Sequence, residues 1–471
     1  MARKNLFRRR RLRSAGDEDR LSALRDDLLL PILRRLDTRW ANLLRELPVL
    51  DLRVTDTLPQ RYRRCLLRGG EASSLPLTPE SSRRLSAMTG RLSLEVFACS
   101  TSPWVNRLVV DAVDSSWGVR DLEVVASLRE PITFPPLVYR FPHGRISRKP
   151  AECRLQSLKL ANCLPPPLQG FAALTTLILQ DLPNYAVYEG VVAACPQLQV
   201  PHLVSYRFES RHRSLVFDAP MSGIRELVID GDNLLATVEL RSLPKLESLA
   251  TLHASVQLCS DAAPCLENVQ FVFDVDSLEG QSLTVVNGLM LDQIYCTLMR
   301  FFRSAHSMTD LVLRFTRPGL WIALKNPFCP MHNLRRLLVV DVPSSLDVSG
   351  PHLLIEAAPL LESIHVHAPQ CEDESGQEIP WQPPSTSRHC HLKELVVVGF
   401  RRTERHLRLV RYTMELSMAL RHVALFKHGH VKDKGPCGWE MVTQQSTGSN
   451  EEKLAVLDET CSTAQIELVL G

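Results

Sequence analysis

The chain lacks the residue patterns that mark most secreted and membrane proteins. None of its 13 cysteines forms a C-x-x-C pair or the short, regular spacing of a disulfide framework, and no asparagine stands in the N-x-[ST] glycosylation pattern. No apolar run approaches the roughly 18 residues that cross a bilayer. The N-terminus carries arginines where a secretory signal needs an apolar stretch. We therefore expect a reduced compartment, the nucleus and/or the cytoplasm, and no membrane partner.

Motifs of the common enzyme classes are also missing. The chain has no G-x-G-x-x-G, no G-x-x-x-x-G-K-[ST], no H-E-x-x-H and no G-x-S-x-G. These patterns place phosphate cradles, zinc ligands and activated serines, so their absence disfavours the corresponding chemistries. We expect no enzyme activity, no catalytic residue and no cofactor.

Three small histidine groups are the densest potential metal ligands: His365 with His367, His389-Cys390-His391, and His428 with His430. Structural zinc sites normally combine ligands in C-x2-4-C or H-x3-5-H spacing, which is absent here. His365 and His367 fit the outward positions of a strand whose Ile364 and Val366 face inward. We interpret the pair as part of a solvated strand face and expect no metal.

Charge excludes one broad class of partner. The 55 Lys and Arg residues against 52 Asp and Glu give a formal charge of only +3, so a general nucleic-acid binder is not expected. The basic excess is local. It lies in the tail of residues 1–16, which we expect to be disordered, and it consists mainly of Arg8, Arg9, Arg10, Arg11 and Arg13. This run is a nuclear localisation signal, a nucleic-acid-binding arm, or a solvated, disordered terminus.

What the sequence has in abundance is a short apolar template, L-x-x-L-x-L, with Val, Ile, Met or Phe as substitutes. Its clear copies are Val119-Leu122-Val124, Leu155-Leu158-Leu160, Leu174-Leu177-Leu179, Ile224-Leu227-Ile229, Leu266-Val269-Phe271, Met308-Leu311-Leu313, Leu334-Leu337-Val339, Leu361-Ile364-Val366, Leu392-Leu395-Val397 and Leu420-Val423-Leu425. Weaker copies begin at Leu198, where Pro201 replaces the middle residue, and at Leu246, where Thr251 replaces the last.

The spacing of these copies predicts a curved stack of repeats. The x-L-x-L part alternates with period two, as a half-buried strand does, and one such unit cannot bury its own apolar face. Leu155 to Leu174 is 19 residues, and Leu334 to Leu361 is 27 residues. Stacking of such units forms a solenoid with one strand per repeat. Lys159 and Ile178 should then occupy matching central positions on the inner face.

The residues between the strands predict the outer side of the solenoid. Runs such as Ala193 to Leu198 end in small residues, Pro and Leu, and a helix would stop before the proline, so helix, turn and strand form the expected unit. Ile294 to Phe302 should form an additional, longer helix. Proline-rich residues 127–150 should form an irregular crossing. In the last part we expect a helix over Glu404 to Leu416, a strand over Arg421 to Phe426 and a closing apolar run at Ile466 to Leu470.

One N-terminal segment carries a family resemblance. Residues 24–36 read Leu-Arg-Asp-Asp-Leu-Leu-Leu-Pro-Ile-Leu-Arg-Arg-Leu, which resembles the F-box pattern L-P-x-D-L-L-x-x-I-L-x-x-L. Residues 391–440 are similar to the FBD-type unit that ends many plant F-box/LRR proteins. The chain thus resembles the plant F-box/LRR family, with residues 17–53 as a truncated F-box-like segment, 54–370 as irregular leucine-rich repeats, 371–390 as a loop and 391–471 as the FBD-like unit.

The resemblance implies a fold and a function. The fold is α/β, an irregular leucine-rich-repeat solenoid with a short helical F-box-like segment and an α+β C-terminal cap. The function is that of a substrate-recognition subunit of an SCF-type ubiquitin ligase, which docks on a Skp-type adaptor and cullin complex and binds a target protein through its repeats. The residues matched to the adaptor interface are Leu24, Asp27, Leu28, Leu29, Ile32, Leu33, Leu36 and Trp40.

The segment also departs from the family. Arg25 replaces the family proline, and only three residues separate Leu36 from Trp40, where the family has a second helix. The alternative is therefore a non-catalytic repeat scaffold, or an inert pseudo-receptor, that lacks adaptor binding because its F-box is incomplete. In that case the apolar stripe of residues 24–36 packs on the first repeat.

Overall fold

A computed structural model describes residues 50–51, 91–97, 119–127, 139–142 and 153–470, together with a few positions between 106 and 113. The last range has gaps at 206–214, 232–236, 274–294, 316–328, 343–348, 369–387 and 444–466, and at some isolated positions. The F-box-like residues and the arginine run of residues 8–13 lie outside the described residues, as do most of the crossing at 127–150 and most of the loop at 371–390.

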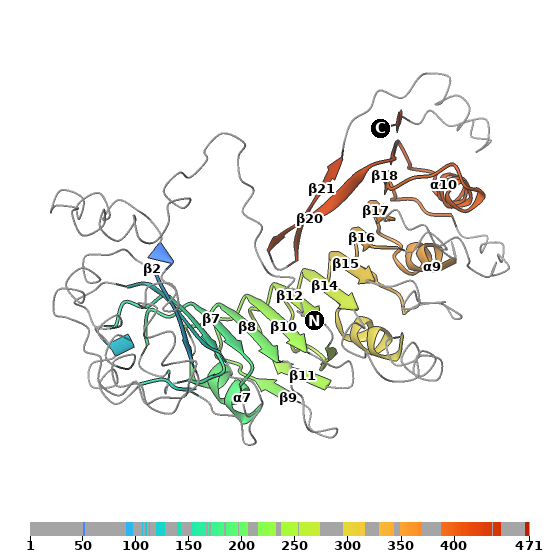
Figure 1. Cartoon of the computed structure of the whole chain (residues 1–471). Coiled ribbons are helices and arrows are strands. Elements are labelled where there is room, and N and C mark those ends of the chain that lie inside the picture. Colours follow the sequence, from blue (N-terminus) through green and yellow to red (C-terminus); the bar gives the residue numbers. More distant parts are fainter. Residues whose placement is uncertain are drawn as a thin grey trace, which may run out of the picture.

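The dominant element is a 15-stranded sheet in which every neighbouring pair of strands is parallel (Figure 1). The strands follow one another in chain order, as a solenoid of stacked repeats requires. They are β1 (Leu50–Asp51), β2 (Arg91–Phe97), β3 (Asp121–Ser127), β5 (Ser157–Ala161), β7 (Thr176–Gln180), β8 (Val200–Ser205), β10 (Glu226–Gly231), β12 (Ser248–Leu252), β14 (Asn268–Phe273), β15 (Asp310–Phe315), β16 (Arg336–Val340), β17 (Ser363–His367), β18 (Glu394–Val398), β19 (His422–Phe426) and β22 (Glu467–Leu470).

The apolar template accounts for the register of this sheet. Leu158 lies beside Leu177 and Leu160 beside Leu179, and each leading leucine, such as Leu174, turns into the same core, where it is fully buried. Each buried leucine contributes about 1.5–3 kcal/mol. The weak copies also form strands, since Pro201 pairs with Leu177 and Thr251 with Phe271. The solenoid prediction is thereby confirmed at the level of a long parallel repeat array.

The outer side of the array differs from the prediction of one helix per repeat. The described part of the chain is mostly β, and its longer helices are α7 (Tyr185–Ala194), residues 295–304, α9 (Ser349–Ala357) and α10 (Glu404–Leu416). Asn106, Val109, Val110 and Val113 are also helical. Elsewhere the outer side forms a three-stranded parallel sheet, β9 (Leu215–Asp218), β11 (Thr237–Ser242) and β13 (Ser255–Leu258).

Repeat length explains which outer element forms. Leu246 to Leu266 is 20 residues, which leaves room for the inner strand, two turns and a short extended segment. Leu266 to Met308 is 42 residues and holds the helix at 295–304, close to its predicted position. The α10 helix has the predicted bounds, and Thr403 caps it by accepting a hydrogen bond from the His406 amide at 3.4 Å.

The C-terminal region extends the array. Strands β18, β19 and β22 continue the same parallel sheet, and the apolar side chains on one face of them join the core cluster that runs from Leu92 to Leu470. Between β19 and β22 the chain forms an antiparallel hairpin of β20 (Gly429–Gly435) and β21 (Gly438–Thr443). This hairpin folds back along the sheet (Figure 1). A further short parallel pair, β4 (Tyr139–Arg140) with β6 (Cys163–Leu164), lies near the N-terminal repeats.

Several strands end at a residue with a left-handed backbone. Asn162, Asp181, Asp341 and Gly399 have φ angles of 53°, 55°, 59° and 81°. Asn, Asp and Gly tolerate this conformation best. At Gly399 the constraint is tightest, because an added Cβ would lie 1.8 Å from the Ala368 carbonyl oxygen.

Replacement of Gly399 by alanine should lower the free energy of unfolding by roughly 1–3 kcal/mol from backbone strain, and by more if the Ala368 backbone cannot shift. Gly190 is the matched control, because it lies inside α7 with no atom within 4 Å of the place that an alanine methyl group would take. Gly190→Ala should stabilise the chain by about 0.4–1 kcal/mol. Urea unfolding followed by circular dichroism measures both, and equal effects of the two variants would contradict this account.

Buried histidines concentrate in the C-terminal repeats. The ring of His352 in α9 lies against the ring of Tyr412 of α10, with centroids 3.6 Å apart and planes tilted by 38°. Its Nε2 has no hydrogen-bond partner among the described residues. Burial lowers the pKa of His352 to about 3. Burial, aided by the charge of Arg401, lowers the pKa of His406 to about 4. Both side chains are therefore neutral in the folded chain at neutral pH.

A lowered histidine pKa gives stability that is present above the ordinary value of about 6.5 and is lost as pH falls toward the folded value. For His352 the loss is of order 4 kcal/mol between pH 6.5 and 3. His352→Phe should flatten the fall of unfolding free energy below pH 6.5, as measured by urea titrations at several pH values. His306→Gln removes an exposed imidazole and should follow the parent curve. If His352→Phe retains the full parent slope, burial of this imidazole is not the source of the acid sensitivity.

Candidate functional site

The N-terminal ends of the strands form a repeated turn that lines up side chains along one edge of the sheet. The amides of Thr309 and Asp310 both donate to the carbonyl oxygen of Glu267, each at 3.0 Å. The amides of Arg335 and Arg336 donate in the same way to Thr309, and the pattern recurs from Arg120 to Lys393. Two successive amides thus fix the residue before each strand in space relative to the preceding repeat.

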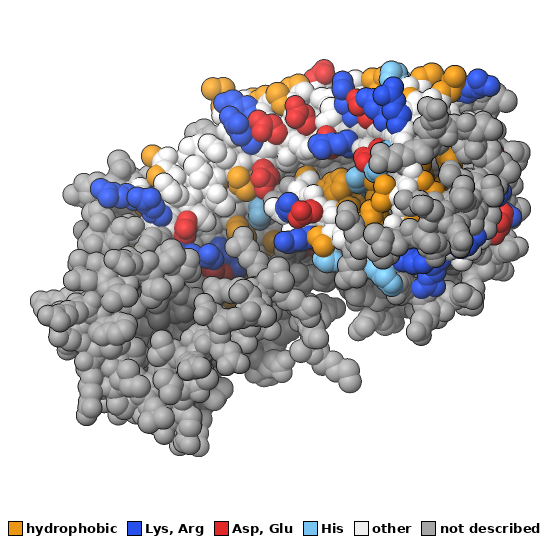
Figure 2. Space-filling model, turned by 90° about the horizontal axis from the view of Figure 1, so that it is seen from above, with side chains coloured by type: hydrophobic (Ala, Val, Ile, Leu, Met, Phe, Trp, Pro, Cys, Tyr) orange, Lys and Arg blue, Asp and Glu red, His pale blue; other side chains and the backbone are white. Residues whose placement is uncertain are grey.

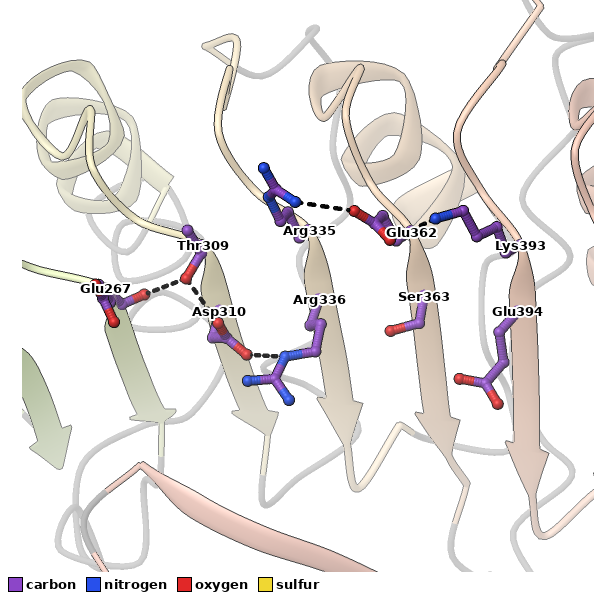
Figure 3. A pocket seen from close by; sticks show the side chains of 9 residues that line it. All are labelled: Glu267, Thr309, Asp310, Arg335, Arg336, Glu362, Ser363, Lys393 and Glu394. Atoms are coloured by element: carbon purple, nitrogen blue, oxygen red, sulfur yellow. Dashed lines mark hydrogen bonds and ion pairs between the residues drawn. The ribbon is translucent and has the colours of Figure 1, made fainter.

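On strands β14 to β18 this turn presents mostly charged side chains. We call the nine residues there the charged edge; they line a groove of about 540 Å³ (Figure 3) and are Glu267, Thr309, Asp310, Arg335, Arg336, Glu362, Ser363, Lys393 and Glu394. Because the strands are parallel and in register, these side chains project side by side from neighbouring repeats.

Ion pairs link the charged edge from repeat to repeat. Glu362 accepts from Arg335 at 3.2 Å and from Lys393 at 2.7 Å, and Arg336 pairs with Asp310 (Figure 3). The hydrogen bond and charge of Lys393 hold the pKa of Glu362 below its usual value, with Arg335 adding to the effect. Since the side chains of Arg335, Lys393 and Glu362 are at least one-third exposed, each pair is worth only about 0.2–1 kcal/mol.

The charges of this edge are balanced. Three basic groups (Arg335, Arg336 and Lys393) face four acidic groups (Glu267, Asp310, Glu362 and Glu394), a net of −1. Figure 2 likewise shows acidic and basic side chains intermingled over the described part of the face in view. Such a surface suits a protein partner of mixed charge better than a polyanion, which needs an excess of Lys and Arg.

The sheet face opposite the main core differs between its two halves. Near the N-terminal strands it is polar: Glu123 accepts from Lys159 at 2.6 Å and from the Ser93 hydroxyl at 3.2 Å. Lys159 lies beside Ile178, in the register expected from the sequence. From β15 to β19 the same face carries two apolar clusters, separated by His365 and His367 of β17. Their buried side chains are Val312, Leu338 and Val340 in one cluster and Val396, Val398, Ala424 and Phe426 in the other.

The β20–β21 hairpin covers this apolar half. Val431 and Trp439 pack on the cluster of Val312, Leu338 and Val340, while Met441 bridges to the cluster around Val396. The Trp439 ring stands edge-on to His365, with centroids 5.3 Å apart. The hairpin therefore occupies the face that a repeat array would otherwise leave open.

A charged network and a thiol fasten the hairpin. Arg314 of β15 donates to Asp341 at 2.7 Å and to Asp433 of β20 at 3.4 Å, and His367 also bonds Asp341, at 3.1 Å. Burial raises the pKa of Asp341, but the His367 hydrogen bond and the Arg314 charge and hydrogen bond outweigh it, so that pKa lies below its usual value.

At the hairpin tip, Cys437 reaches the distant strands β12 and β14. Its thiol donates to the Leu249 carbonyl oxygen at 3.1 Å, and its amide donates to the Gln270 side chain at 3.2 Å. Burial raises the pKa of this thiol to about 12, so it is protonated at neutral pH. Cys437 therefore acts as a hydrogen-bond donor to the array.

Two of the three histidine groups singled out in the sequence contain side chains that serve the fold, whereas His428 and His430 are exposed. His389 is buried; its Nε2 contacts the Ala358 carbonyl oxygen at 2.8 Å, and its Nδ1 accepts from the Leu392 amide at 3.1 Å. His365 and His367 point away from the core as predicted. The prediction that they lie on a solvated face was wrong, because the hairpin covers this face. His365 pairs with Glu394, and His367 pairs with Asp341. Within the described residues no group of three or more His, Cys, Asp or Glu is placed to hold a metal.

The remaining predicted site residues lie outside the described part of the chain. These are Leu24, Asp27, Leu28, Leu29, Ile32, Leu33, Leu36 and Trp40 of the adaptor match, and Arg8, Arg9, Arg10, Arg11 and Arg13 of the possible nuclear signal. The hairpin and the sheet face that it covers were not predicted from the sequence. The alternation in Trp439-Glu440-Met441 and the apolar outward residues of β16 and β18 were the signals available.

No model of a known protein family matches the chain, and no curated protein matches it in sequence. In the described ranges, no helix is long and apolar enough to cross a bilayer.

Proposed function

We propose that this chain is a non-catalytic recognition subunit that binds a target protein over the charged edge. The supporting observation is the charged edge itself: on five neighbouring strands it displays self-balanced, partly exposed charges over a shallow groove. A small ligand needs an enclosed pocket with convergent polar groups, whereas a broad repeat surface suits a folded protein.

The N-terminal resemblance extends the proposal to a place in a larger assembly. If residues 24–36 act as an F-box, the chain is a substrate receptor of an SCF-type ubiquitin ligase, with a Skp-type adaptor at one end and the target on the repeats. The competing proposal is a repeat scaffold without an adaptor. The short interval between Leu36 and Trp40 favours that alternative.

Reversal of charge on the edge should weaken target capture. Arg335→Glu with Lys393→Glu replaces two attractive groups by repulsive ones, and we expect at least a tenfold loss of the target, equivalent to about 1.4 kcal/mol. Proximity labelling during proteasome inhibition, read by quantitative mass spectrometry, identifies and measures the captured protein.

Arg241→Glu is the matched control, because Arg241 forms a comparable exposed pair with Glu239 at 3.0 Å on the outer sheet. The double variant and the control should both keep the parent thermal midpoint within a few degrees, since exposed pairs contribute little to stability. Undiminished capture by the double variant would exclude the charged edge as the target surface.

Adaptor binding separates a ligase receptor from a scaffold. In a pull-down with a Skp-type adaptor, Leu29→Asp with Ile32→Asp should abolish a micromolar complex of about 8 kcal/mol, because each buried side chain contributes about 1.5–3 kcal/mol and each new carboxylate would be desolvated. Alanine in place of Arg8 to Arg13 should leave adaptor binding intact while altering localisation if that run is a nuclear signal.

Two outcomes would refute the adaptor proposal. One is binding by the Leu29→Asp, Ile32→Asp variant that equals that of the parent. The other is no binding at high micromolar concentration by either the parent or a version with a family-type helix inserted between Leu36 and Trp40. In either case the scaffold alternative stands.

A further inference from the structure

The β20–β21 hairpin is attached to the array differently from every strand beneath it. Neighbouring strands of the large sheet share backbone ladders, whereas the hairpin's two strands pair only with each other in the described structure. The hydrogen bonds and ion pairs found between hairpin and sheet each use a side chain, namely Arg314 with Asp433 and the contacts of Cys437. The hairpin is thus a separate layer laid face-on across the sheet.

Burial is unequal across this contact. On the sheet side, Leu338 and Val398 are completely buried and Val340 is 1% exposed. On the hairpin side, Val431, Trp439 and Met441 are only partly buried, and most of β20 is exposed. An isolated two-stranded hairpin is marginally stable in water, so its order depends on this one-sided contact.

The surface beneath the hairpin has the character of a binding surface. It is a stripe of two apolar clusters, on β15–β16 and on β18–β19, with His365 and His367 of β17 between them. Charged groups border it, with Arg314 on one side and Glu394 at the N-terminal edge. An exposed apolar patch with a polar rim is typical of protein-binding sites. In the folded chain the hairpin supplies the matching side chains: an aromatic ring, two aliphatic groups and one carboxylate.

We propose that the hairpin is a displaceable cover, which seals an apolar docking face for an extended partner segment carrying an aromatic residue, aliphatic residues and a carboxylate. Such a segment would replace Trp439, Val431 and Met441 on the stripe and Asp433 at Arg314. This face is distinct from the charged edge, so the proposal holds or fails independently of the target surface described above.

Cys437 offers a natural gauge of hairpin opening. The residue is only partly buried, but its thiol bonds the Leu249 carbonyl oxygen and its raised pKa keeps it protonated. Because reaction needs the thiolate, the thiol should react fast only when the tip leaves β12 and β14. Cys163 is the gauge of global unfolding: it is fully buried in the main core and burial raises its pKa to about 12, as for Cys437. Cys390 is exposed and reports complete access.

The test is peptide-resolved alkylation of the native full-length chain. Cys437 should react faster than Cys163 and more slowly than Cys390, because the hairpin opens without unfolding of the core. Asp433→Asn with Trp439→Ala should accelerate Cys437 at least tenfold while leaving Cys163 unchanged. Glu440→Gln is the matched control, since Glu440 pairs with Lys434 on the exposed side of the hairpin, and it should behave as the parent.

If Cys437 reacts only in step with Cys163 in the parent chain, the hairpin opens only with the whole fold and the proposal is overturned. This comparison needs no variant, so it decides the matter even if the double variant fails to fold.

Docking is tested with a synthetic peptide of residues 428–443 as the probe. The labelled peptide should bind the Asp433→Asn, Trp439→Ala chain at least tenfold more tightly than the parent, whose own hairpin competes for the face. A peptide with alanine in place of its tryptophan should lose this binding. If the double variant opens at Cys437 but does not bind the peptide, the stripe is not a docking face and the proposal fails.

Discussion

Parallel stacking of one-sided strands is the constraint on which the rest of the structure depends. Leu158 and Leu177 are completely buried because each lies beside the corresponding residue of a neighbouring repeat. Without that neighbour, either strand would expose its apolar side to water. Each strand therefore needs a neighbouring repeat, or another segment of the chain, to cover its apolar side. The 15 strands of the sheet form one array with one principal core.

The same stacking places the charged edge. Two backbone amides of each repeat donate to a carbonyl oxygen of the preceding repeat. Side chains such as Arg335 and Glu362 therefore lie in a row, and no additional structural element is needed to position them. A change at one edge position leaves the backbone bonds intact. Such a surface is free to vary in sequence while the core is not, which suits a recognition role.

The inner strands were predictable from the sequence because their determinants are local. Spacing alone located Leu392-Leu395-Val397 and even the imperfect copy at Pro201, since periodic burial leaves a periodic pattern. Strand β2 was not predicted, because Thr89 stands where the leading leucine of the template would be. The outer strands β9, β11 and β13 were not predicted, because a helix was expected on the outer side of every repeat, whereas the short repeats have room only for an extended segment.

The candidate site was less predictable because it depends on contacts between distant residues. Nothing local to Cys437 indicates that its thiol meets Leu249, and nothing near His365 indicates that Trp439 lies over it. The outward residues of β16 and β18 are Leu and Val where a solvated face would carry polar groups. That departure from alternation is a sequence signal of a second layer, although it does not say which segment supplies the layer.

The hydrogen bond from Cys437 to Leu249 joins residues 188 positions apart, in an architecture whose other contacts connect mainly adjacent repeats. A simple repeat array behaves as a one-dimensional chain, so its end repeats can fray one at a time. The hairpin adds a long-range tie that encloses β12 to β19 in a single loop. Fraying of any repeat inside that loop strains or breaks the same distant contact. The tie should therefore form late and slowly in folding, because it closes only after every repeat between its two ends is in place.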